Sequence, residues 1–151
     1  MKITTVQRIL SLPGGLTAKR VEAIATALRL AGLLPKGGRG LHAPDADAAQ
    51  IALFTLAVAG ADRVANAVDT AINLSNIVDR NGDSLQKILE YTIRITRYAS
   101  VIRAIRIYPF LNIAEISYIE RGQEMRLVRL HPKNSSLKFQ NNSDLMIKEY
   151  V

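Results

Sequence analysis

Residues 16–40 combine basic side chains with very small ones, a mixture suited to contact with a polyanion. Three cations, Lys19, Arg20 and Arg29, are spaced along one predicted helix, and two more stand in a run of glycines directly behind it. Lysine and arginine can contact phosphate or a guanine edge, while alanine and threonine methyl groups can contact the methyl group of thymine. These residue types offer the chemistry of nucleic-acid recognition.

The helix that carries these cations is expected to run from about Ala18 to Ala31. Thr17 is the predicted N-cap, because its hydroxyl can accept a hydrogen bond from a first-turn amide. Gly32 offers a C-terminal cap and Pro35 prevents the helix from continuing. The apolar residues at helical spacing predict a buried stripe. They are Val21, Ile24, Ala25, Leu28 and Ala31.

The face opposite this stripe is the predicted reading surface. Lys19, Ala23 and Thr26 lie on it, with Arg20 and Arg29 on its flanks, and we expect it to lack acidic residues. A face without bulk can lie close to base edges. The alternative is an ordinary surface helix followed by a flexible basic loop.

The segment behind the helix, Lys36-Gly-Gly-Arg-Gly40, has the composition of a wing. Its glycines allow the backbone to turn tightly around two cations, which could then contact the DNA backbone or the minor groove. The predicted DNA-binding residues are therefore Thr17, Lys19, Arg20, Ala23, Thr26, Arg29, Lys36, Gly37, Gly38, Arg39 and Gly40.

Positive charge is concentrated in this part of the chain. The 151 residues carry a formal net charge of +7. Residues 1–43 hold seven basic side chains against Glu22 alone, whereas residues 44–80 carry a net charge of −3. A localised basic excess favours a nucleic-acid footprint.

The sequence lacks the residues and motifs that cysteine chemistry, metal binding and nucleotide binding require. Cysteine is absent, which excludes disulfides, thiolate metal sites and cysteine nucleophiles. His42 and His131 have no partner at metal-ligand spacing and are expected to be loop residues, although His42 could touch a phosphate. Neither of the glycine-rich segments, residues 13–19 and 36–40, has the pattern of a nucleotide-binding loop. We therefore expect no enzyme, no cofactor, no metal and no small-molecule substrate.

Cellular location can also be anticipated from composition. No apolar run approaches the roughly 18 residues that cross a bilayer, and the N-terminus has no apolar signal core. We expect a soluble protein of the bacterial cytoplasm without a membrane partner.

The rest of the chain is predicted to form further helices. One of them is apolar on all sides and should be buried on all sides, as the central helix of the N-terminal module or partly under another subunit. Asp45 or Asp47 should cap this helix, and Ser84 should cap the last one. The predicted helices span 4–12, 48–59, 61–79 and 85–99.

A change to period-two alternation then predicts an antiparallel meander of three strands, with one face packed on the 85–99 helix. The strands are expected around 105–108, 114–119 and 125–130, with a further short strand at 145–148. Glutamates and arginines of the meander are interpreted as cross-strand salt bridges on a solvated face. The functional alternative is a second phosphate-contacting surface or a subunit interface. These residues are Glu115, Glu120, Glu124, Arg103, Arg106, Arg121, Arg126 and Arg129.

The predicted fold class is therefore α+β. We expect a helical, winged helix-turn-helix-like DNA-binding module over residues 1–80, a helix plus meander that mediates assembly over 81–132, and a polar tail over 133–151. The protein should be a homo-oligomer.

The segment Leu28-Arg-Leu-Ala-Gly-Leu-Leu-Pro-Lys-Gly-Gly-Arg-Gly-Leu-His-Ala-Pro44 resembles the pattern LREAGLLPxGGRGxxAP of small phage and prophage proteins. It is also similar to the helix end and wing of winged helix-turn-helix regulators. The resemblance covers about residues 16–60. It implies a phage-type protein that binds double-stranded DNA, most simply a transcriptional regulator.

Two alternative functions are compatible with the sequence. The order of elements is similar to that of small terminase subunits, which recognise viral DNA for packaging as oligomeric rings. A non-enzymatic interaction or inhibitor protein, whose basic face binds an acidic protein, would also have this composition.

Overall fold

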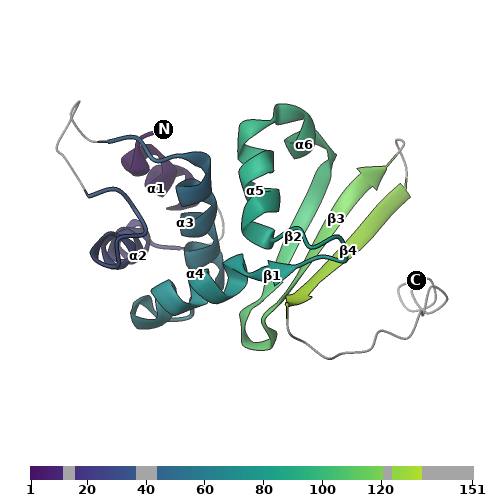
Figure 1. Ribbon diagram of the computed structural model, residues 1–151. Helices are drawn as coiled ribbons and strands as arrows, with labels where there is room; N and C mark the ends of the chain where they lie inside the picture. Colours follow the sequence, from purple (N-terminus) through teal and green to yellow (C-terminus); the bar gives the residue numbers. More distant parts are fainter. Residues whose placement is uncertain (12–15, 37–43, 121–123, 134–151) are drawn as a thin grey trace.

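The computed structural model describes residues 1–11, 16–36, 44–120 and 124–133, and the α+β class is confirmed (Figure 1). The elements are α1 (Ile3–Ser11), α2 (Ala18–Leu30), α3 (Ala48–Gly60), η2 (Val64–Asn66), α4 (Ala67–Ser75), β1 (Ile77–Val78), α5 (Leu85–Arg94), α6 (Thr96–Val101), β2 (Ile102–Tyr108), η3 (Pro109–Leu111), β3 (Ile113–Glu120) and β4 (Glu124–Pro132). The predicted strand at 145–148 lies outside the described residues.

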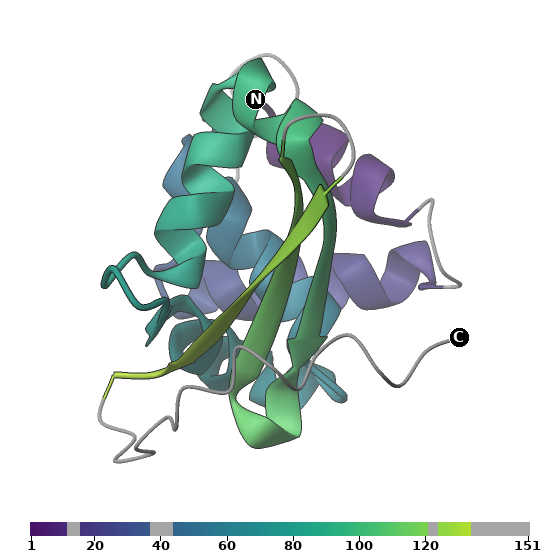
Figure 2. The ribbon, with the colours of Figure 1, turned by 90° about the vertical axis from the view of Figure 1, so that its right-hand side faces the viewer.

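Helices and sheet are stacked in layers. Figure 1 shows α1 and α2 on one side, α3 and α5 in the middle, and the sheet on the other side. Turning the molecule brings the sheet to the front, with the helices behind it (Figure 2). The helical N-terminal half and the sheet therefore occupy opposite sides of the molecule.

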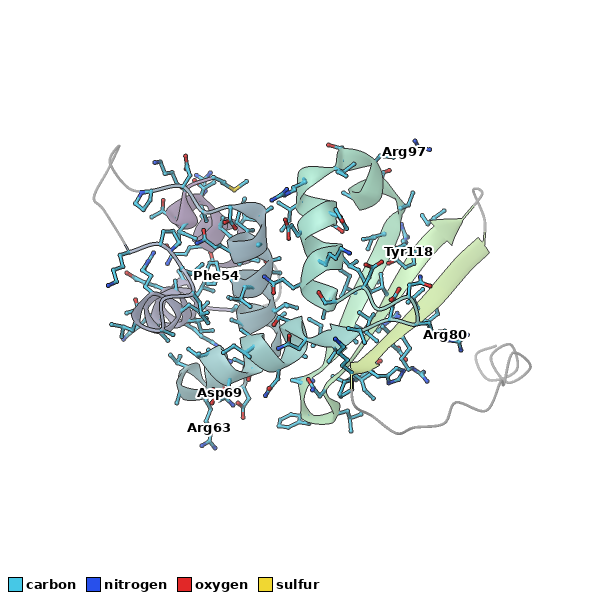
Figure 3. The ribbon with its side chains drawn as sticks, viewed as in Figure 1. Phe54, Arg63, Asp69, Arg80, Arg97 and Tyr118 are labelled. Carbon is cyan, nitrogen blue, oxygen red and sulfur yellow. The ribbon has the colours of Figure 1, made fainter. Side chains whose placement is uncertain are left out.

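The central layer depends on α3, which is buried on nearly all sides as predicted. Asp47 is its N-cap: the Asp47 carboxylate accepts a hydrogen bond from the Gln50 amide at 2.7 Å, and the Gln50 side chain accepts one from the Asp47 amide at 3.0 Å. Phe54 points into the cluster shared with α2 (Figure 3). Ala52 and Leu56 belong to a second cluster with α5 and the sheet. One helix thus supports both halves.

Within the described residues the sheet has four strands, so the predicted number of three is wrong. Their order is β1-β4-β3-β2, and all neighbours are antiparallel. The additional strand, β1, pairs Ile77 with Pro132 and Val78 with His131. Two residues are too few to show alternation, and their partner lies far along the chain. This pairing also joins the predicted 1–80 unit to the 81–132 unit.

The sheet face toward the helices is apolar, as expected. Ala114, Ile116 and Leu130 are fully buried, and they pack in one cluster with Leu85 and Leu89 of α5. The meander therefore uses one face for the core and leaves the other without a helix in the described part of the chain.

Two predicted helices are shorter than expected. The 61–79 segment forms a 3-10 turn, then α4, then β1, because Ala61 and Arg63 are extended and the Arg63 amide bonds to the Asn66 side chain. The 85–99 segment breaks at Ile95, which has φ −123° and ψ 103°. Ile95 and Ala99 are exposed. The break turns the chain away from the core into α6.

Across the described ranges, no helix is long and apolar enough to span a membrane.

Gly60 lets α3 and α4 approach closely, and its replacement by alanine should destabilise the protein. A Cβ there would lie 2.4 Å from Leu74 Cδ1 and 3.0 Å from Thr70 Cγ2, and Leu74 is only 1% exposed. Overpacking costs about 1–3 kcal/mol, against a helix-propensity gain of about 0.5–1 kcal/mol. Urea denaturation should show a lower free energy of unfolding for Gly60→Ala. In a Leu74→Ala background the same change should stabilise; equal effects in both backgrounds would contradict the close contact.

Candidate nucleic-acid interface

The predicted reading helix is present with both of its caps. Thr17 Oγ1 accepts a hydrogen bond from the Arg20 amide at 3.3 Å. At the other end, Gly32 adopts φ +75°, its amide bonds to the Arg29 carbonyl at 3.1 Å, and the Leu33 amide bonds to the Leu28 carbonyl at 2.9 Å. This is the Schellman arrangement that glycine favours. The limits of α2 were therefore readable from sequence.

The buried stripe of α2 is confirmed for four of its five residues. Val21, Ile24, Ala25 and Leu28 are 0% exposed and pack in the cluster with α1 and α3. Ala31 was expected to be buried, but it is exposed, because the helix has ended and the chain turns at the cap. The position of α2 on the molecule is fixed by its apolar side.

The opposite face of α2 is exposed, and it is less basic than predicted. Lys19 and Thr26 are exposed, whereas Ala23 is half-buried. The expectation that the face lacks acidic residues is wrong: Glu22 is exposed and lies one turn from both Lys19 and Thr26. The exposed face of α2 is therefore rotated slightly from the predicted one, toward Glu22 and away from Ala23.

Arg20 has a structural role that the sequence did not reveal. Its Nη2 donates to the carbonyl of Ala61 at 2.5 Å and to the carbonyl of Asp62 at 2.8 Å. Ala61 is the C-cap of α3, so the guanidinium binds carbonyls at the end of that helix. Arg20 therefore fastens α2 to α3. Only tertiary contact could have shown this.

The remaining predicted residues lie beyond the C-terminal end of α2 or on its flank. Arg29 is half-buried, and its Nε is buried without a hydrogen-bond partner in the described structure. Lys36 is exposed. Gly37, Gly38, Arg39 and Gly40 lie outside the described residues, as does His42. The predicted wing is therefore not part of the described geometry.

A cross-strand ion pair on the sheet was predicted and is present. Glu115 Oε1 accepts hydrogen bonds from Arg129 Nε at 2.9 Å and Arg129 Nη2 at 2.7 Å. Arg106 is the partner of Glu115 on the other side, so the three form one row across β2, β3 and β4. Position 121 and the side chains at 120, 124 and 126 are outside the description.

His131 lies in β4 and not in a loop, so that prediction is wrong. Burial lowers the pKa of His131, and the charges of Arg129 and Arg80 lower it further. Arg80 projects from the turn after β1, on the sheet side of the molecule (Figure 3). The end of the sheet is thus an electropositive environment.

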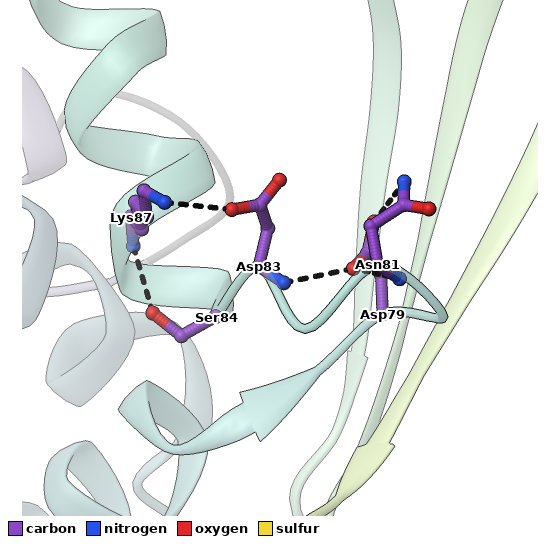
Figure 4. A network of polar contacts seen from close by, with 5 residues as sticks. All are labelled: Asp79, Asn81, Asp83, Ser84 and Lys87. Carbon is purple, nitrogen blue, oxygen red and sulfur yellow. Dashed lines mark hydrogen bonds and ion pairs between the residues drawn. The ribbon is translucent and has the colours of Figure 1, made fainter.

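The turn between β1 and α5 gathers acidic residues for a structural purpose. Asp79 Oδ1 accepts hydrogen bonds from the amides of Asn81 at 2.8 Å and Asp83 at 2.9 Å (Figure 4). Asp83 in turn pairs with Lys87 at 2.8 Å. These contacts stabilise the turn into α5. In the described ranges, no group of three or more His, Cys, Asp or Glu side chains could hold a metal ion.

Comparison with known proteins gives no match for this chain. No family model matches it, and neither a curated protein nor a solved structure is significantly similar.

Removing the Arg20 guanidinium should lower stability. Arg20→Ala leaves two carbonyls without their donor, and hydrogen bonds to charged groups contribute about 1.5–3 kcal/mol. We expect the free energy of unfolding, measured in urea, to fall by about 1–2 kcal/mol. Arg20→Lys keeps the charge but not the planar guanidinium that reaches both carbonyls, and should recover only part of the loss. Wild-type stability of Arg20→Ala would show that the contact with α3 is unimportant.

His131 should titrate below the ordinary histidine pKa of about 6.5. Because the folded pKa is depressed, the folded state binds fewer protons: the stability contribution is complete above pH 6.5 and is lost as the pH falls through the folded pKa. An NMR titration, assigned with His131→Gln, measures this directly. Arg80→Gln should raise the pKa only part of the way, because burial is the larger cause. An unchanged pKa in Arg80→Gln would contradict the electrostatic contribution.

Proposed function

We propose that the protein binds double-stranded DNA with α2 as the reading helix, and that it acts as a transcriptional regulator of the phage or mobile-element type. The observation that carries this proposal is the presentation of α2. The helix is capped at both ends, four residues of its apolar stripe are fully buried, and Lys19 and Thr26 are exposed on the opposite face.

The arrangement suits a major groove in its dimensions. Lys19 and Thr26 are seven residues apart, which places them about 10 Å apart along the helix axis. This distance corresponds to about three base steps of a duplex. A lysine can contact guanine or phosphate, and a threonine methyl group can contact thymine.

Rigid support strengthens the proposal. α1 packs in the same cluster as α2, so it can brace the reading helix as the first helix of a helix-turn-helix does. Arg20 adds a polar attachment to α3. A reading helix held this firmly needs little ordering when it binds, which reduces the entropic cost of association.

Glu22 makes the proposal sharply testable, because its carboxylate would repel a phosphate held by the same face. The logarithm of the binding constant should fall linearly with the logarithm of the salt concentration. Lys19→Gln should weaken binding and reduce the salt slope by about one unit if Lys19 contacts phosphate. Glu22→Gln, which changes the charge in the opposite sense on the same face, should strengthen binding.

Lys87→Gln is the control, since it removes one positive charge from α5 at a side chain already paired with Asp83. Fluorescence anisotropy with duplexes selected from a random pool provides the measurement. The absence of binding at low salt would exclude the proposed function. Equal affinities for Lys19→Gln, Glu22→Gln and the wild type would exclude α2 as the contact surface.

A further inference from the structure

The sheet face turned away from the helices, here called the outer sheet face, carries a second group of cations. Side chains alternate along each strand, and the inward residues Ala114, Ile116 and Leu130 are buried, so Glu115 and Arg129 point outward. Arg106 shares their row. Lys133 directly follows β4 at the spacing of Arg129 and His131, and it is exposed.

The acid on this face is already neutralised. Glu115 Oε1 receives both hydrogen bonds from Arg129, and Glu115 Oε2 receives one from the Tyr108 hydroxyl at 3.2 Å. Arg106 is directly opposite Glu115 on β2, yet it makes no ion pair or hydrogen bond within the described residues. Among the described side chains, Lys133 is likewise unpaired. The outer sheet face therefore has uncompensated positive charge.

The environment of His131 is consistent with this charge. His131 is two residues from Arg129 along β4 and therefore on the same face. The charges of Arg129 and Arg80 disfavour the protonated, cationic form of its imidazole. The positive region thus extends from Arg106 across the sheet toward the β1 edge.

Nothing in the described part of the chain covers the outer sheet face, which Figure 2 presents to the viewer. A second copy of the chain is a poor occupant, because a two-fold contact would bring the same unpaired cations together and remove them from water. A polyanion complements the face in charge and can be contacted without deep burial.

We propose that the outer sheet face binds the phosphate backbone of a second DNA segment, so that one molecule bridges two duplexes. This inference rests on the proposed function of α2. The helix and the outer sheet face lie on opposite sides of the molecule, separated by α3 and α5 (Figure 1). DNA has a persistence length of about 150 bp, so one short duplex cannot bend around the protein to reach both.

Bridging can be measured by capture of a free fluorescent duplex on beads that carry a tethered duplex of the same sequence, at about 50 mM salt, where phosphate contacts are strong. The variant of the outer sheet face is Arg106→Gln with Lys133→Gln. Its matched control is Lys87→Gln with Arg94→Gln, which removes two charges from ion pairs on α5. Binding to the tethered duplex alone is recorded for every protein.

We expect the wild type and the control to capture the free duplex. The variant of the outer sheet face should still bind the tethered duplex, while its capture of the free one falls about tenfold or more. Glu115→Gln keeps an acceptor for Arg129 but removes the negative charge, and it should increase capture.

Three results would overturn the inference. No binding to the tethered duplex would exclude the proposed function and the bridge together. Binding without capture would exclude the bridge alone and would leave this face for an acidic protein or another partner. Capture that persists in the variant of the outer sheet face would show that oligomerisation, and not this face, joins the duplexes.

Discussion

Burial of α3 is the interaction on which the rest of the structure depends. An almost wholly apolar helix removes its apolar surface from water only if other elements cover it on all sides. Phe54 fills the side toward α2, and Leu56 fills the side toward α5 and the sheet. The two halves of the chain are thus held on one helix, and each turns its charged surface away from it. Both proposed DNA contacts follow from this placement.

The parts of the fold that could be predicted from sequence are those determined by neighbouring residues. The N-caps Thr17, Asp47 and Ser84 act on amides three residues away, and Gly32 closes α2 through contacts within a single turn. Periodicity identified the buried stripe of α2 because four residues point to one side of a regular helix. The strand pattern likewise located β2, β3 and β4.

The parts that could not be predicted depend on distant partners. β1 exists because β4 pairs with it. The break at Ile95, whose backbone is extended, has no signal in the apolar spacing of residues 85–99. An arginine on the flank of a predicted reading helix is expected to bind DNA phosphate. In the fold, Arg20 instead donates a hydrogen bond to the carbonyl of Ala61. The exposure of Glu22 was missed because a small rotation of a helix moves a flanking residue into the exposed face. Sequence located the candidate helix but not the charge balance of its surface.

The proposed contact between the exposed face of α2 and DNA can be mapped by NMR from the shifts of backbone amides. A labelled sample titrated with a short duplex should show its largest perturbations around Lys19, Glu22 and Thr26, with weaker changes along the outer sheet face. Perturbations that spare α2 while affecting other surfaces would contradict the account, as would an unchanged spectrum at low salt.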